Sequence, residues 1–148
     1  MTNIVSKGRC PHGQLFVVSM EKIVRSIKKR PFNLISMATV SILYVLNNKV
    51  VKPNTTGLSH VFFVSYFNDL ICPLWFLAYV NLLMITNDKE ILELKKLLLI
   101  CLGAGLVWEF VAPFLKKGSV TDPWDLVCYA IGTIVYWIIL KGVAKKQL

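Results

Sequence analysis

Residues 124–143 read WDLVCYAIGTIVYWIILKGV, a run of 20 residues in which only Asp125 and Lys141 are charged. A helix needs about 20 apolar residues to cross the ~30 Å hydrocarbon layer of a bilayer, so this run predicts a membrane-spanning helix. Backbone N–H and C=O groups inside a bilayer must be hydrogen-bonded within the protein, and segments of this length achieve that as helices. Three further apolar runs occupy residues 32–51, 61–86 and 97–115. The sequence therefore predicts an all-α, polytopic transmembrane helix bundle of about four spans.

The composition of the whole chain agrees with a membrane protein. Of the 148 residues, 55% are hydrophobic and 17% are charged, and the mean hydropathy is +0.60. Soluble and disordered chains are less apolar than this. The net charge of +9 alone would suit a nucleic-acid partner. We expect none, because membrane topology and anionic lipids account for the basic residues and no nucleic-acid motif accompanies them.

The distribution of basic residues predicts the orientation of the chain. Thirteen of the 17 Lys and Arg residues belong to the flanks on one side of the predicted membrane and four to the flanks on the other. Cytoplasmic flanks carry the excess of Lys and Arg, so we expect a multi-pass protein of the cytoplasmic membrane with both termini in the cytoplasm. The first span is expected to be short, because Asn47, Asn48 and Lys49 interrupt its apolar run.

The first 31 residues differ in character from the rest of the chain. Apolar residues recur there at helical spacing beside a basic face, which is typical of an amphipathic helix lying in the membrane interface. A basic tail that only orients the first span would look the same. The segment contains no apolar run long enough for a signal peptide, so we expect it to be retained. The predicted organisation is an interfacial cytoplasmic segment, residues 1–31, followed by one transmembrane four-helix domain, residues 32–148.

Four acidic residues lie within or beside the predicted spans, and all four belong to the outer half of the protein on this topology. They are Asp69, Glu109, Asp122 and Asp125. A carboxylate at the centre of a spanning helix costs on the order of 2.5–3.5 kcal/mol by insertion scales, so such groups normally face the bundle interior and have partners. His60 opens the second span on the same side. The remaining acids lie among lysines outside the membrane, where solvation explains them.

Two of these acids are each followed four residues later by proline. Pro73 follows Asp69 and Pro113 follows Glu109. Proline has no N–H, so in a helix the backbone carbonyl of each acidic residue loses its partner. Each site would then offer a carboxylate and a carbonyl oxygen at one height, which suits a cation, an ammonium group or sugar hydroxyls. Alternatively, Asn68 or Asp69 caps a shorter second span and Pro113 ends the third.

The helical period places several candidate residues on common faces. On the fourth span one stripe contains Asp125, Tyr129, Gly132 and Tyr136, and on the third span a stripe of small residues, Cys101 and Gly105, leads to Glu109. Small residues allow another helix to approach closely, so we expect the two faces to meet. Asp122 and Pro123 have the pattern of a helix start, with Asp122 as the N-cap.

The region from Val107 to Trp137 resembles the VanZ-like integral membrane proteins. The resemblance consists of an intramembrane Glu near the end of one span, a short polar turn, and Asp-x-x-x-polar-x-x-Gly at the start of the next. The matching residues are Glu109, Ser119, Asp125, Tyr129 and Gly132, with His60 as a further match. Ala112 stands where the family usually has Gln, and Tyr129 where Asn is usual. The resemblance implies a small protein of the bacterial cytoplasmic membrane with a role in the cell envelope.

These observations favour a non-enzymatic protein that binds a polar or cationic head group of a lipid or glycolipid in an outer-leaflet acidic pocket. The expected ligand-binding residues are Asp69, Glu109, Asp125, Tyr129 and His60, and the expected kink and packing residues are Pro73, Pro113, Gly105 and Gly132. Membrane lipids are the expected partners, with a second copy of the chain or another envelope membrane protein as an assembly partner. We expect no cofactor and no resident metal.

Two other functions would draw on the same acids. A metal-dependent enzyme acting on a lipid phosphate would use carboxylates and a histidine to hold the metal, although no His-x-x-x-His or Asp-x-Asp spacing occurs. An ion or proton pathway would also need buried acids, and four helices would have to oligomerise to enclose it.

Overall fold

The computed structural model describes residues 31–85, 89–115 and 123–145 together with Val24 and Lys28, and it leaves the side chains of residues 110 and 112–115 undescribed. Every secondary-structure element in this part of the chain is helical, which confirms the predicted all-α fold. The elements are α2 (Pro31–Leu46), η1 (Asn47–Val51), α3 (Lys52–Asn54), α4 (Gly57–Val61), η2 (Phe62–Tyr66), α5 (Phe67–Ile85), α6 (Leu94–Leu115) and α7 (Pro123–Lys145). Of the predicted interfacial segment, residues 1–31, the structure describes Val24 and Lys28, which are helical and exposed, and Pro31, which begins α2.

Three uninterrupted helical stretches are long and apolar enough to cross a membrane. They cover Pro31–Asn54, Gly57–Ile85 and Pro123–Lys145, with 24, 29 and 23 residues. Only 11–28% of the apolar windows of these stretches is buried inside the bundle, so most of their residues keep surface on its exterior. An apolar exterior of this kind identifies a membrane protein. α6 has 22 residues, which at 1.5 Å per residue also matches a bilayer.

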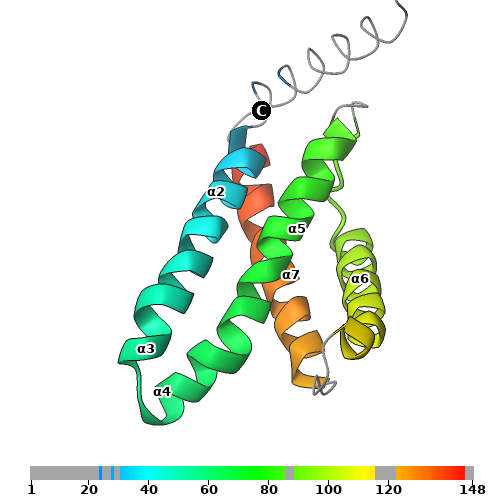
Figure 1. The fold of residues 1–148 in the computed structure, drawn as a ribbon. Coiled ribbons are helices and arrows are strands. Elements are labelled where there is room, and N and C mark those ends of the chain that lie inside the picture. Colours follow the sequence, from blue (N-terminus) through cyan, green and yellow to red (C-terminus); the bar gives the residue numbers. More distant parts are fainter. Residues whose placement is uncertain (1–23, 25–27, 29–30, 86–88, 116–122, 146–148) are drawn as a thin grey trace, which may run out of the picture.

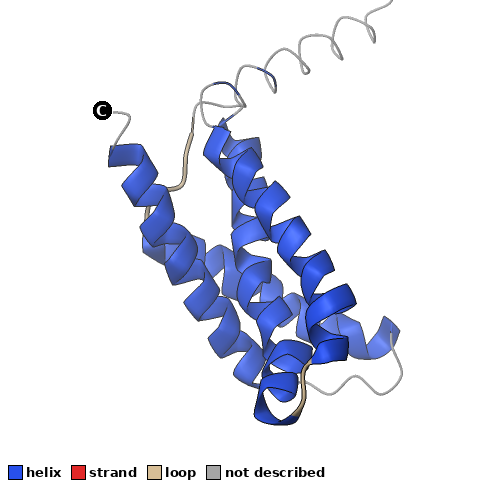
Figure 2. Cartoon of the chain, turned by 90° about the vertical axis from the view of Figure 1, so that its left-hand side faces the viewer, coloured by secondary structure: helices blue, strands red, loops and turns tan. Residues whose placement is uncertain are grey.

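α5 and α7 run opposite to α2, and α6, which connects them, is steeply inclined to all three (Figures 1 and 2). α5 packs against both α2 and α7, whereas α6 packs mainly against α7. The described ends of the chain, Pro31 and Lys145, therefore lie at the same end of the bundle. Gly57 makes the turn from α3 to α4 possible, because its φ of 66° lies in the left-handed region that side chains disfavour.

The first span was expected to be short because Asn47, Asn48 and Lys49 interrupt its apolar run, but the helix is continuous over 24 residues. The helix continues as a π-helical turn through Val51 and ends at Asn54. Asn47 is buried with 1% of its surface exposed, and its amide Nδ2 donates to the carbonyl of Phe63 and to Oδ1 of Asn68 at 3.0 and 2.9 Å. A polar side chain can lie within a membrane-spanning helix when it is hydrogen-bonded to the neighbouring helix. Asn47 therefore does not shorten the first span.

A buried polar cluster joins three helices toward the Pro31 end of the bundle. Tyr136 on α7 is fully buried and donates its hydroxyl to Oδ1 of Asn33 on α2 at 3.0 Å. Asn81 on α5 donates to the same hydroxyl at 3.0 Å and also pairs with both the N–H and the C=O of Ile91. The cluster therefore fixes α2, α5 and α7 to one another and holds Ile91, in the segment that leads into α6.

Candidate functional site

Asp69 and Tyr129 form the centre of the candidate site. Asp69 lies in the first turn of α5, and Tyr129 lies on α7 with 8% of its surface exposed. The Tyr129 hydroxyl is oriented as a donor to Oδ1 of Asp69, at 3.5 Å. None of the described residues donates a hydrogen bond to the other carboxylate oxygen, Oδ2. A half-buried carboxylate thus keeps one acceptor atom for a ligand.

The helix around Asp69 is continuous, which excludes the alternative that Asn68 or Asp69 caps a shorter span. Helical structure begins at Gly57 and runs through Pro73 to Ile85. Asp69 is therefore an interior residue of a helix, and the N–H that would bond its carbonyl is absent at Pro73. Pro113 likewise lies within α6, which ends at Leu115. The carbonyl of Glu109 therefore lacks its helical donor too.

Gly132 brings α7 directly against the backbone of α5. A Cβ added at Gly132 would collide with the carbonyl oxygen of Leu70 and would lie 3.0 Å from Cγ of Pro73. Pro73 itself is buried in this contact. Two residues singled out for packing therefore touch each other, and their contact positions Tyr129, one turn earlier on α7, beside Asp69.

Gly105 on α6 provides the space for the Tyr129 ring. A Cβ at Gly105 would lie 2.7 Å from Cδ2 of Tyr129, closer than carbon atoms approach. The predicted meeting of the small face of residues 101–109 with the stripe of α7 therefore occurs in the structure. All members of that stripe face inward, since Tyr129, Gly132 and Tyr136 are buried and Asp125 is half-buried.

The other two carboxylates lie near the first. Asp125 in the first turn of α7 and Glu109 on α6 are both half-buried. Both interact electrostatically with Asp69, Asp125 more strongly than Glu109, and the attraction of Asp69 to Lys52 is weaker than either. Three helices thus contribute one acid each to a region of negative potential. Asp122, the predicted N-cap, lies outside the described residues.

His60 does not join this cluster. It lies on α4, is exposed, and has Thr55 as its contact at 3.5 Å. Nine residues of helix separate it from Asp69, which is about 13 Å along the axis. The sequence prediction placed His60 and Asp69 in one pocket because both belong to the same half of the second span. Two residues can share that half and still be too far apart along the helix for their side chains to meet.

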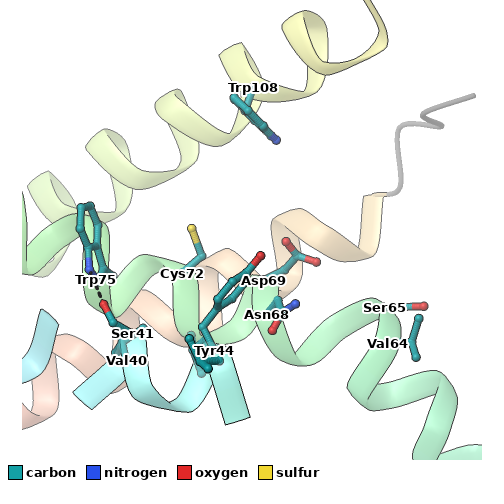
Figure 3. Close-up of a pocket in the computed structure, with 12 residues that line it drawn as sticks. Val40, Ser41, Tyr44, Val64, Ser65, Asn68, Asp69, Cys72, Trp75 and Trp108 are labelled. Atoms are coloured by element: carbon teal, nitrogen blue, oxygen red, sulfur yellow. Dashed lines mark hydrogen bonds between the residues drawn. The ribbon is translucent and has the colours of Figure 1, made fainter. Parts of the chain in front are cut away.

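A groove of about 770 Å³ lies beside Asp69, between α2, α5 and α6. Figure 3 shows Trp108 pointing from α6 into the space above α5, with Tyr44 on the α2 side. Asp69, Asn68, Cys72 and Trp75 line the groove from α5, and Val40, Ser41, Tyr44 and Val45 line it from α2. Its volume is in the range of small-molecule sites. The groove was not predicted, since α2 forms one of its walls and carries no acid.

Two hydrogen bonds hold the continuous helix of α2 and η1 against α5 beside the groove. Asn47 pairs with Asn68 at one end, and the indole N–H of Trp75 donates to the hydroxyl of Ser41 at 3.2 Å at the other. Oδ1 of Asn47 is buried and has no partner among the described residues. Asn47 is the first residue of the π-helical turn η1, and the π-helical turn η2 ends two residues before Asn68. Such turns are frequent at functional sites. The sequence signal that could have indicated this contact is the presence of one asparagine, Asn47 or Asn68, in each of two successive apolar runs.

Comparison of the chain with known protein families, with curated proteins and with solved structures finds no match. The site is therefore interpreted from its own chemistry. Among the described residues, no group of three or more His, Cys, Asp and Glu side chains is arranged to hold a metal ion.

Proposed function

We propose that this chain is a small multi-pass protein of a bacterial cytoplasmic membrane that binds the polar or cationic head group of a lipid or lipid-linked glycan. In this proposal α2 with α3, α4 with α5, α6 and α7 form four spans, and both termini are cytoplasmic. The hairpin between α3 and α4 then faces outward, so the site opens to the outer leaflet. A role in the cell envelope and a relation to the VanZ-like proteins are part of the proposal.

The observation that carries the proposal is the position of Asp69. Its carboxylate lies on the wall of a groove of about 770 Å³ and contacts Tyr129 from the opposite helix. An acid inside a membrane is costly and is normally retained for a partner. The described protein residues supply one hydrogen-bond donor to it, and Asp125 and Glu109 add negative charge nearby. A polar head group with hydroxyl or ammonium donors would complete these interactions.

The test is native mass spectrometry of the gently extracted protein beside three variants. We expect the wild-type protein to retain a lipid, and Asp69→Asn and Glu109→Gln to lose it, because each removes charge while keeping size. Glu93→Gln is the matched control, since Glu93 is exposed and pairs with Lys96 away from the groove. Retention that is equal in all four proteins would overturn the proposal.

A further inference from the structure

The charge of the groove determines which head groups it can accept. Asp69 is the single charged side chain among the described residues that line the groove. Of the further charges that act on Asp69, Asp125 and Glu109 are negative and have larger effects than the positive Lys52. A phosphate in the groove would therefore meet repulsion from Asp69 and find no cationic side chain among the described residues that line it, whereas an ammonium group would be attracted.

The walls of the groove suit a cation with an apolar continuation. Tyr44, Trp75 and Trp108 present aromatic rings to it, and aromatic faces attract ammonium groups. Oδ2 of Asp69 can accept a hydrogen bond from an ammonium N–H, since Tyr129 occupies only Oδ1. A primary ammonium has N–H donors to give, and a quaternary ammonium has none.

The groove is open at the side of the bundle. Tyr44 and Trp108 remain 53% and 57% exposed. α2 packs on α5 and α6 packs on α7, so the space between α2 and α6 is not closed by extensive packing of these two helices. In a bilayer this side faces lipid tails. A ligand can therefore enter sideways and leave its own tail among them.

We infer that the groove binds a membrane-resident amphiphile with a primary ammonium group attached to its hydrocarbon tail and with no phosphate. This inference rests on the proposed function and names the ligand class of the same site. The ammonium contacts Asp69 between the aromatic walls, and the tail leaves between α2 and α6. Zwitterionic phospholipids are rejected, because their phosphate would accompany the ammonium into a groove whose described lining residues include no cation.

The test is photocrosslinking of the full chain in vesicles with four probes that share a diazirine-bearing alkyl tail. The probes end in a primary amine, a trimethylammonium, a hydroxyl and a phosphoethanolamine group. Crosslinks are mapped by peptide mass spectrometry in the wild-type protein, Asp69→Asn, Trp108→Leu and the control Glu93→Gln. We expect the amine probe to label residues of the groove, and Asp69→Asn to reduce this labelling about tenfold or more. Trp108→Leu changes an exposed side chain and tests the wall without threatening folding.

Each outcome separates this inference from the proposed function. Preferential labelling by the amine probe that is lost in Asp69→Asn and retained in Glu93→Gln supports both. Groove labelling that depends on Asp69 but is equal or stronger with the hydroxyl, trimethylammonium or phosphoethanolamine probe overturns the ligand class and leaves head-group binding in place. Labelling by all probes that ignores Asp69 and Trp108 overturns both.

Discussion

Single buried polar side chains connect the helices of this bundle. The hydroxyl of Tyr136 is shared between Asn33 and Asn81, and all three residues are fully buried. Inside a membrane the alternative to such a bond is an unsatisfied polar group in an apolar environment. These residues therefore contribute to the pairing of α2, α5 and α7 as well as to packing.

Replacing Tyr136 by Phe removes this shared hydroxyl and keeps the ring. We expect a loss of about 1 kcal/mol in the free energy of unfolding, because two asparagines lose a partner at once. Graded unfolding in mixed detergent micelles measures it. Tyr79→Phe is the control, since Tyr79 is 41% exposed and stacks on Trp75 through its ring. Equal effects of the two substitutions would contradict the assigned role of the cluster.

Close contacts between pairs of helices depend on glycines at two crossings. Gly132 lets α7 touch the backbone of α5, and Gly105 lets α6 receive the Tyr129 ring. Gly142 on α7 and Gly103 on α6 have nothing within 4 Å of an added Cβ. Each helix therefore offers a matched control for its own packing glycine.

Gly132→Ala is expected to destabilise the bundle by about 1–3 kcal/mol, because the new methyl group meets backbone of α5 that cannot move aside alone. Gly142→Ala should be neutral or slightly stabilising, since alanine favours helix and meets no neighbour. Comparison of their unfolding midpoints checks the prediction. A Gly132→Ala protein as stable as the wild type would contradict the close contact between α5 and α7.

Gly105→Ala is expected to act on the site. Its methyl group would displace the Tyr129 ring and weaken the contact between the tyrosine hydroxyl and Asp69. Lipid retention in native mass spectrometry should fall in Gly105→Ala and in Tyr129→Phe, and should persist in Gly103→Ala. If Gly103→Ala also loses the lipid, the loss comes from substitution of α6 in general and not from displacement of the Tyr129 ring.

The topology of the whole molecule gives a further prediction. The described chain begins and ends at the same end of the bundle, and the hairpin at Gly57 lies at the other. With the basic end in the cytoplasm, Ser59→Cys should react in intact cells with a membrane-impermeant thiol reagent, because Ser59 is exposed on α4. Lys145→Cys should react after permeabilisation only. The reverse pattern would invert the orientation and place the groove toward the inner leaflet.

The sequence by itself determined the helical class and the positions of the long helices to within a few residues. Length and hydropathy suffice for this, because a bilayer demands about 20 apolar residues and internally bonded backbone. It also determined that the stripe of Tyr129, Gly132 and Tyr136 faces inward, since a helix repeats every 3.6 residues. Because a charge inside a membrane is costly and normally faces the bundle interior, the sequence also predicted that three acids gather there. These acids, Asp69, Glu109 and Asp125, lie near one another.

Only the tertiary structure decided which side chains meet across helices. Asn47 was expected to shorten the first span by interrupting its apolar run, whereas it lies within a continuous helix and its Nδ2 donates to Asn68, 21 residues away. His60 was expected in the pocket, yet one helix places it too far from Asp69 for contact. The groove is formed by side chains from α2, α5 and α6 together. The residue pattern within one helix cannot specify which side chains of other helices lie next to it. The physical reason is that hydropathy and helical period act within one helix, whereas hydrogen bonds and close packing act between helices.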